Sequence, residues 1–135
     1  FHDGFARVKL VGKGWNFIKT NGELLLKEYI WFVNPFREGL ACVQIEGKGW
    51  NVINGQGELL WSKYKNYDNV YSFCNGFAWV RKKGRGNNFI NTQGELLWGK
   101  DKWFDNVYQF TNGFARVEIE GEWYKLNTKG ELIKS

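Results

Sequence analysis

The phrase GWNFIKTNGELLL at residues 14–26 decides the fold, because the chain repeats it. It returns as GWNVINGQGELLW at residues 49–61 and as GNNFINTQGELLW at residues 86–98, and a shorter copy, WYKLNTKGELIK, occupies residues 123–134. Repetition at a nearly constant interval is typical of proteins built from tandem structural units. We therefore expect one structural unit to occur four times along the 135 residues.

A second recurring phrase, Phe-x-x-Gly, marks the start of each unit. It begins at Phe1, Phe36, Phe73 and Phe110, at intervals of 35, 37 and 37 residues. This spacing predicts a single repeat domain over residues 1–135, made of units 1–35, 36–72, 73–109 and 110–135. The sequence contains no methionine, and its last unit stops after the Gly-Glu phrase, so we expect a fragment of a longer chain.

Each unit predicts a β-hairpin followed by a third strand or extended segment. In the first unit Ala6, Val8 and Leu10 alternate with Arg7 and Lys9, which is the period of a strand with two different faces. A glycine-rich turn follows, then an aromatic strand, an Asn-Gly turn and a short apolar run. No segment sustains the period of a helix.

A single hairpin cannot bury its own apolar face, so neighbouring units are expected to stack. The predicted fold class is all-β, with four tandem hairpin repeats of about 36 residues stacked as an open superhelical array. A closed, propeller-like ring is the alternative. A unit of this length is short for a four-stranded propeller blade, which favours the open array.

The order of these phrases resembles the WG repeat, also called the KWG repeat, of bacterial proteins. The departure lies at the defining Trp-Gly dipeptide, where this chain has Trp15-Asn16, Trp50-Asn51, Asn87-Asn88 and Trp123-Tyr124. Asparagine is the best non-glycine residue for left-handed backbone, so its replacement of glycine is physically mild at three of the four places, Tyr124 being the exception. The resemblance implies β-repeat modules attached to larger bacterial proteins and transfers no catalytic residue.

Residues for catalysis or metal binding are nearly absent from the sequence. His2 is the sole histidine, and Cys42 and Cys74 lack the paired spacing of a zinc site or a disulfide framework. We therefore expect no enzyme activity, no metal and no cofactor, and two free thiols.

No apolar run is long enough for a transmembrane helix. The sequence assigns the protein to no particular cellular compartment.

Recurring carboxylates are expected to serve the turns, by accepting hydrogen bonds from local N–H groups, rather than to carry out chemistry. One glutamate occurs in every Gly-Glu phrase, and an element present in all units usually concerns folding: Glu23, Glu58, Glu95 and Glu131. Asp68 and Asp105 are interpreted as Asx-turn residues. The Gly-Lys-Gly and Gly-Arg-Gly segments are interpreted as hairpin turns, not as phosphate-binding loops.

The varying exposed positions are the predicted recognition surface. Trp79 is expected to face outward beside a basic run, and three connector aromatics extend the candidate binding surface: Trp79, Arg81, Lys82, Lys83, Arg85, Trp31, Tyr64 and Trp103. The net charge of +5 suits weak attraction to anionic surfaces. The repeated β surface favours a non-catalytic module for protein–protein interaction or scaffolding. A protein partner or neighbouring copies of the chain are expected. Carbohydrate binding and a self-assembling array are the alternatives, and nucleic acid is disfavoured.

Overall fold

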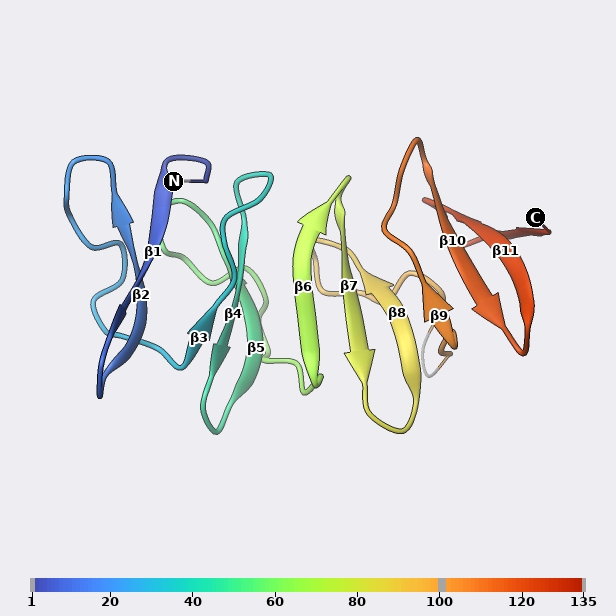
Figure 1. The fold of residues 1–135 in the computed structure, drawn as a ribbon, viewed down its shortest axis with the longest axis horizontal. Coiled ribbons are helices and arrows are strands. Elements are labelled where there is room, and N and C mark those ends of the chain that lie inside the picture. The colour runs from blue at the N-terminus through green and yellow to red at the C-terminus, as the bar shows by residue number, and fades with distance from the viewer. Residues whose placement is uncertain (1, 100–101, 135) are drawn as a thin grey trace. The chain divides into compact units, whose positions relative to one another are not determined.

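The computed structural model describes residues 2–99 and 102–134, so Phe1 lies outside the described residues. The described part folds into twelve strands and contains no helix, which confirms the all-β prediction (Figure 1). The strands are β1 (Phe5–Leu10), β2 (Gly14–Lys19), β3 (Phe32–Val33), β4 (Ala41–Ile45), β5 (Gly49–Ile53), β6 (Asn69–Cys74), β7 (Phe77–Lys82), β8 (Gly86–Ile90), β9 (Asn106–Val107), β10 (Phe114–Ile119), β11 (Glu122–Asn127) and β12 (Leu132–Lys134).

The strands form four small antiparallel sheets, one for each repeat. Their strand orders are β1-β2, β3-β4-β5, β6-β7-β8 and β12-β11-β10-β9. Each sheet contains one of the predicted hairpins, namely β1-β2, β4-β5, β7-β8 and β10-β11, so the tandem-hairpin prediction is confirmed. The strands β3 and β9 come from the connector of the preceding repeat and pair with the first hairpin strand of the next. Each of these connectors therefore ties one repeat to its successor.

The chain divides into two compact units, which we describe separately. The first consists of Phe1–Asn66 and Tyr71–Phe73, and the second of Tyr67–Val70 and Cys74–Ser135. Each unit holds most of two predicted repeats. The single-domain arrangement, and the choice between an open array and a closed ring, stay predictions.

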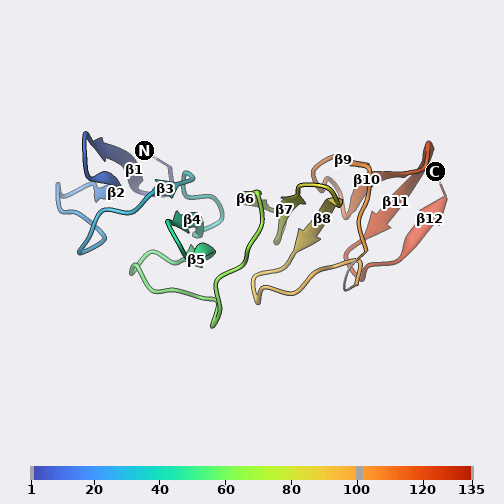
Figure 2. The ribbon, with the colours of Figure 1, turned by 90° about the horizontal axis from the view of Figure 1, so that it is seen from below.

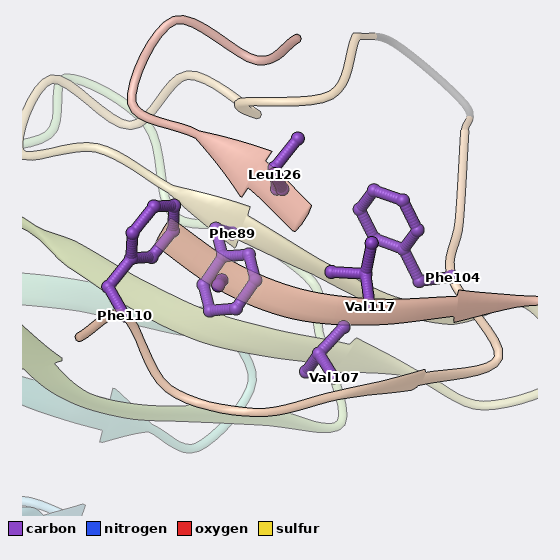
Figure 3. Packing of buried hydrophobic residues seen from close by; sticks show 7 residues of the cluster. Phe89, Phe104, Val107, Phe110, Val117 and Leu126 are labelled. Atoms are coloured by element: carbon purple, nitrogen blue, oxygen red, sulfur yellow. The ribbon is translucent and has the colours of Figure 1, made fainter. Parts of the chain in front are cut away.

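Buried aromatic rings hold the second unit together. The first residue of the fourth repeat, Phe110, stacks on Phe77 at 4.7 Å and meets Phe89 edge-on at 4.9 Å between ring centroids. Figure 3 shows Phe89 and Phe110 side by side within a larger apolar cluster. The buried members of this cluster are Phe89, Phe104, Val107, Phe110, Ala115, Val117 and Leu126.

The first unit repeats this aromatic contact with its own residues. Phe36 stacks on Phe5 at 4.3 Å and meets Phe17 edge-on at 4.6 Å between ring centroids. The recurring Phe of the Phe-x-x-Gly phrase therefore inserts between two aromatic rings of the preceding repeat. Such pairs contribute about 0.5–1.5 kcal/mol beyond the burial of their apolar area.

In each of the first three repeats, a buried asparagine side chain binds the backbone of the segment that follows the second hairpin strand. Asn51 has no exposed surface, and its Nδ2 donates to the carbonyl oxygen of Trp61 at 3.1 Å. Its Oδ1 accepts from the backbone N–H groups of Val52 at 2.7 Å and Trp61 at 3.1 Å. The side chain thus behaves like a short piece of partner strand, and it fastens the end of the Gly-Glu-Leu segment to β5.

The same arrangement recurs at Asn16 and Asn88. Asn16 bonds both the N–H and the carbonyl of Leu26, at 3.0 and 2.9 Å. Asn88 accepts from the N–H of Trp98 at 3.3 Å and donates to the carbonyl of Lys102 at 2.7 Å. We call each of these three side chains with its backbone partners an asparagine clamp.

The tolerance of asparagine for left-handed backbone does not explain these positions. None of them has a positive φ; the non-glycine residues that do are Asp3, Glu38, Asn75, Asn112 and Glu120. The three clamp residues lie inside extended strands, where a left-handed conformation would break the ladder. Their value at this position is a side chain that both donates and accepts hydrogen bonds.

The fourth repeat has Tyr124 in place of the asparagine and uses its backbone instead. Here Tyr124 pairs with Lys134 and Leu126 with Leu132, so β12 continues the ladder beside β11 (Figure 2). In the first three repeats the same segment makes only an isolated bridge, at Leu24, Leu59 and Leu96. The third strand predicted for each unit is therefore regular only where no clamp interrupts it.

We expect Asn51→Ala to lower the free energy of unfolding by about 2–4 kcal/mol, because it leaves a buried N–H and a buried carbonyl of Trp61 without their partner. Urea unfolding followed by tryptophan fluorescence measures the change. The exposed Asn66→Ala variant is the control and should stay within about 0.5 kcal/mol of the parent. Equal stability of the two variants would contradict the clamp.

The two cysteines are free, as predicted, but they differ in environment. Cys42 is fully buried in β4, whereas Cys74 is partly exposed at the end of β6. Burial raises the pKa of the Cys42 thiol to about 12. Since the thiolate is the reactive species, the Cys42 thiol is inert near neutral pH.

At pH 8 iodoacetamide should alkylate Cys74 at least about a hundredfold faster than Cys42. Peptide mass spectrometry over a time course gives the two rates. In 8 M urea (the control) both residues should react at similar rates, because unfolding removes the difference in burial. Similar rates in the folded chain would show that Cys42 is not enclosed.

Candidate binding groove at Trp31

The first connector places Trp31 on the surface of the first unit. The backbone of Ile30 pairs with Trp15, with N–H to carbonyl distances of 2.7 and 2.8 Å, and this bridge fixes the connector against β2. Ile30 is half-buried, and the next side chain, that of Trp31, is 55 % exposed. Of the predicted connector aromatics, Trp31 is the one that the structure leaves most accessible.

Trp31 lines two adjoining hollows, which we call together the Trp31 groove. The larger has a volume of about 610 Å³ and the smaller about 390 Å³, and they share Trp31, Ile45 and Lys48. The charged side chains of the larger hollow come from β1, from the hairpin turns of two repeats and from the first connector: Lys9, Lys13, Lys48, Glu28 and Glu46. The groove therefore combines an exposed indole with a small excess of positive charge.

A second aromatic ring of the groove, Trp15, is already occupied by cations of its own repeat. The guanidinium of Arg7 lies 5.3 Å, and the ammonium of Lys9 5.7 Å, from the centroid of the Trp15 ring. Both distances are within the range of cation–π attraction. A ligand that stacks on an aromatic face in this groove would therefore meet Trp31 first.

Tyr64 adjoins the same groove through Lys48. The Lys48 ammonium lies 5.7 Å from the centroid of the Tyr64 ring. Tyr64 itself is half-buried and borders a separate, mostly apolar hollow of about 320 Å³ with Leu26 and Leu59. Two residues of the predicted surface, Trp31 and Tyr64, are thus joined by a lysine that sequence comparison did not single out.

The predicted aromatic-plus-cation patch of the third repeat needs a correction. Trp79 does not project freely into solvent: it is half-buried, packs against the Phe89 cluster and donates from Nε1 to Asn87 Oδ1 at 2.8 Å. Its flat indole fills space beside the core because Phe89 lies opposite it on β8. Of the basic residues in this patch Lys82 is half-buried, and those exposed are Arg81, Lys83 and Arg85.

Trp103 also packs against a neighbouring ring and does not present an exposed face for a ligand to stack on. It is half-buried and meets Tyr67 edge-on at 6.3 Å between ring centroids. Its Nε1 is buried without a hydrogen-bond partner among the described residues. Burial also raises the pKa of the Tyr67 phenol.

The recurring carboxylates do serve the turns, by a different bond from the one predicted. Glu58 Oε1 accepts from Asn54 Nδ2 at 3.0 Å, and Asn54 Oδ1 accepts the N–H groups of Gln56 and Glu58, both at 3.0 Å. Asn91 with Glu95 and Asn127 with Glu131 repeat this bond. The asparagine, not the glutamate, is the acceptor for the turn N–H groups.

The interpretation of Asp68 and Asp105 as Asx-turn residues was wrong. Asp105 Oδ2 accepts from the N–H of Glu120 at 2.7 Å, and Asp68 accepts from the N–H of Lys83. Both N–H groups lie 15 positions ahead, in the turn of the next hairpin. These aspartates therefore hold the tip of the following repeat.

Among the described residues no three His, Cys, Asp or Glu side chains gather as they would around a metal ion. The described residues likewise form no helix that could span a membrane.

Sequence reasoning missed the lysines of the groove. Lys9, Lys13 and Lys48 come from hairpin turns and strand ends, and only the fold brings them to Trp31. One signal was available: Trp31 lies five residues before Phe36, at the position where the second and third repeats have Asp68 and Asp105. A large aromatic residue where sibling repeats are polar indicates a feature that the fold itself does not require.

We expect Trp31→Ala to change the free energy of unfolding by less than about 1 kcal/mol, because the ring is largely exposed. The matched variant Trp50→Ala should cost about 3–5 kcal/mol, because Trp50 is 2 % exposed. Urea denaturation with circular dichroism detection compares the two. A loss for Trp31→Ala as large as that for Trp50→Ala would place Trp31 in the core.

Two solved structures with a similar fold are crystal structures of computationally designed proteins. The Ika8 protein matches with a TM-score of 0.57 and 13 % identity, over 98 % of this chain and 46 % of its own. The Ika4 protein matches with a TM-score of 0.54 and 12 % identity, over 94 % of this chain and 87 % of its own. The chain thus spans about half the length of Ika8. At these identities the likeness concerns the fold alone.

No curated protein matches the sequence. The family model for the WG containing repeat matches residues 15–48, 50–85 and 104–123. These segments cover more than half of the chain and include parts of all four hairpins. The chain belongs to the WG containing repeat family.

Proposed function

We propose that this chain is a non-catalytic recognition module that binds another protein through the Trp31 groove. The observation that carries the proposal is the exposed Trp31 between two hollows, at a position where sibling repeats have polar residues. Tryptophan is enriched among the residues that dominate protein interfaces. Its burial by a partner removes a large apolar ring from water at a small cost in side-chain entropy.

The charge around the groove indicates the character of the partner. Lys9, Lys13 and Lys48 outnumber Glu28 and Glu46, and the whole chain carries a net charge of +5. Complementary charge accelerates encounter and sets the register of binding more than it adds affinity. The proposed partner segment therefore carries acidic side chains beside an apolar or aromatic group that covers the Trp31 ring.

The positions that recur in every repeat support a non-catalytic role. All four recurring glutamates accept a hydrogen bond from an asparagine of the same turn. His2 lies at the exposed N-terminal end, where its Nδ1 faces an Arg37 nitrogen at 2.6 Å. A group already committed to a turn or facing a cation is poorly placed to transfer protons. In a larger bacterial protein such a module would act as a scaffold.

Carbohydrate binding is a second candidate, favoured by the polar lining of the smaller hollow. Gln44 and Asn66 offer amide donors and acceptors beside Trp31. A flat aromatic face with a few convergent polar groups is a frequent arrangement in sugar sites. The choice between the two ligand classes is open to a direct test.

The test pairs a phage-displayed library of random peptides with a glycan array. We expect acidic peptides containing an aromatic residue to be selected. Their affinity should fall at least about tenfold in Trp31→Ala and in Lys48→Glu, a loss of about 1.4 kcal/mol or more. The control carries Lys83→Glu and Arg85→Glu in the second unit and should bind as the parent does.

Two outcomes would contradict the proposal. Glycan binding that is lost in Trp31→Ala, with no peptide selected, would replace the protein partner with a carbohydrate. Peptide selection that Trp31→Ala leaves unchanged would remove the Trp31 groove from the function.

A further inference from the structure

The asparagine clamps hold the same position in the first and third repeats, but the side chain at that position differs. Asn16 Oδ1 accepts from the N–H of Leu26 at 3.0 Å, and Asn88 Oδ1 accepts from the N–H of Trp98 at 3.3 Å. Leu26 and Trp98 both follow the recurring Gly-Glu-Leu-Leu phrase. Because the clamp fixes the backbone in both repeats, a leucine in one repeat stands where an indole stands in the other.

The connector residue beside this position also changes. Ile30 and Phe104 each form a backbone bridge from their connector to the second strand of their hairpin, so they occupy matching places. In the second unit the rings of Trp98 and Phe104 stack, with centroids 4.0 Å apart and planes inclined by 13°. In the first unit the same two places hold Leu26 and Ile30, whose side chains are smaller and not flat.

The stacked rings cover part of the buried core in the second unit. Phe104 has no exposed surface, and Trp98 is half-buried against the cluster in which Figure 3 shows Phe104. Both rings belong to this apolar group together with four aliphatic residues: Val117, Ile119, Leu126 and Leu132.

The first unit has a hollow at the equivalent place, which we call the Leu26 hollow. Its volume is about 320 Å³, and both Leu26 and Ile30 line it. Its other aliphatic walls are the residues that match the four just named: Val43, Ile45, Ile53 and Leu59. All residues that line the hollow belong to the first unit. The first unit therefore has an open space where the second unit has two stacked rings.

The walls of the Leu26 hollow are accessible. Leu59 is 49 % exposed, whereas its counterpart Leu132 is half-buried. Ile30 is half-buried, whereas its counterpart Phe104 has no exposed surface. A group that enters the hollow would remove apolar surface from water, which is the main driving force for the binding of apolar ligands.

The lining of the hollow indicates the chemistry of its occupant. Tyr64 borders the hollow and offers a ring against which a flat aromatic ligand packs. The charged residues of the lining, Lys27 and Glu28, are exposed and opposite in sign, so they favour no net charge on a ligand. A volume of about 320 Å³ lies at the lower end of the range of small-molecule sites.

We propose that the Leu26 hollow binds a free, uncharged small molecule with a fused aromatic ring of about the size of indole. The ring takes the place that the Trp98 side chain occupies in the second unit, and it covers Leu26, Ile30 and Leu59. This inference goes beyond the proposed function, because neither Trp31 nor the three lysines of the Trp31 groove line the Leu26 hollow.

The test titrates indole into the chain with isotope-labelled methyl groups on isoleucine, leucine and valine, observed by nuclear magnetic resonance. The ring current of bound indole should shift the methyl signals of Ile45 and Leu59, with a dissociation constant of about 1 mM or tighter for a ligand of this size. The matched methyl groups of Ile119 and Leu132 are the control. They should not shift, because Trp98 already packs against the same cluster.

A variant that fills the hollow makes the test specific. Leu26→Trp combined with Ile30→Phe reproduces the stacked pair of the second unit and should weaken indole binding at least about tenfold. Leu59→Asp is a second variant at an exposed wall residue, and it should have a similar effect because it places a charge beside the bound ring. Trp31→Ala should bind indole as the parent does, so failure here and failure of the Trp31 groove are distinguishable.

The choice of ligand class has its own controls. Cyclohexanol, whose ring is not flat, should bind at least about tenfold more weakly than indole, because it loses the aromatic contact with Tyr64. Tighter binding of N-acetyltryptophanamide than of indole would identify a tryptophan side chain of a partner protein as the occupant and would overturn the proposal of a free small molecule.

Three further results would overturn the proposal. The first is the absence of shifts at Ile45 and Leu59 in about 5 mM indole, which would fill most of a site with a dissociation constant of about 1 mM. The second is an equal shift at Ile119 and Leu132, or undiminished binding in both the filling variant and Leu59→Asp. The third is equal affinity for cyclohexanol and indole.

Discussion

The asparagine clamp is the contact on which the shape of each early repeat depends. After its second strand the chain must turn, run back along that strand and then leave for the next hairpin. A continuous ladder would hold the returning segment in place, as β12 is held beside β11. The buried side chain of Asn51 instead bonds one residue of that segment, Trp61, and ends the pairing there. The connector is then free to reach the next repeat while no buried backbone group of Trp61 at this contact loses its partner.

Connectors and aromatic rings convert these separate hairpins into joined pairs. The connector strand β9 completes the sheet of the following hairpin, and Asp105 from the same connector holds its turn. Phe110 then stacks on one ring of the repeat before it and meets a second ring edge-on. Backbone pairing sets the register, since a slip by one residue would turn every side chain to the opposite face. Stacking supplies the apolar burial that one hairpin lacks.

The side chains that line the Trp31 groove differ among the repeats, so the binding proposed there would be a property of the first unit alone. The buried rings and asparagine clamps recur instead, because they serve the fold that all repeats share.

The sequence by itself determined the number of repeats, the hairpin within each, the turn role of the recurring glutamates and the family. These follow from periods and turn residues, which are local properties. Tertiary structure decided what each polar or aromatic residue touches. Trp79 is partly buried because Phe89 lies opposite it across the sheet, and Asn51 is a clamp because Trp61 returns to meet it. Lys9, Lys13 and Lys48 gather around Trp31 only after two hairpins and a connector pack together. Such contacts join residues distant in sequence, and no local pattern encodes them.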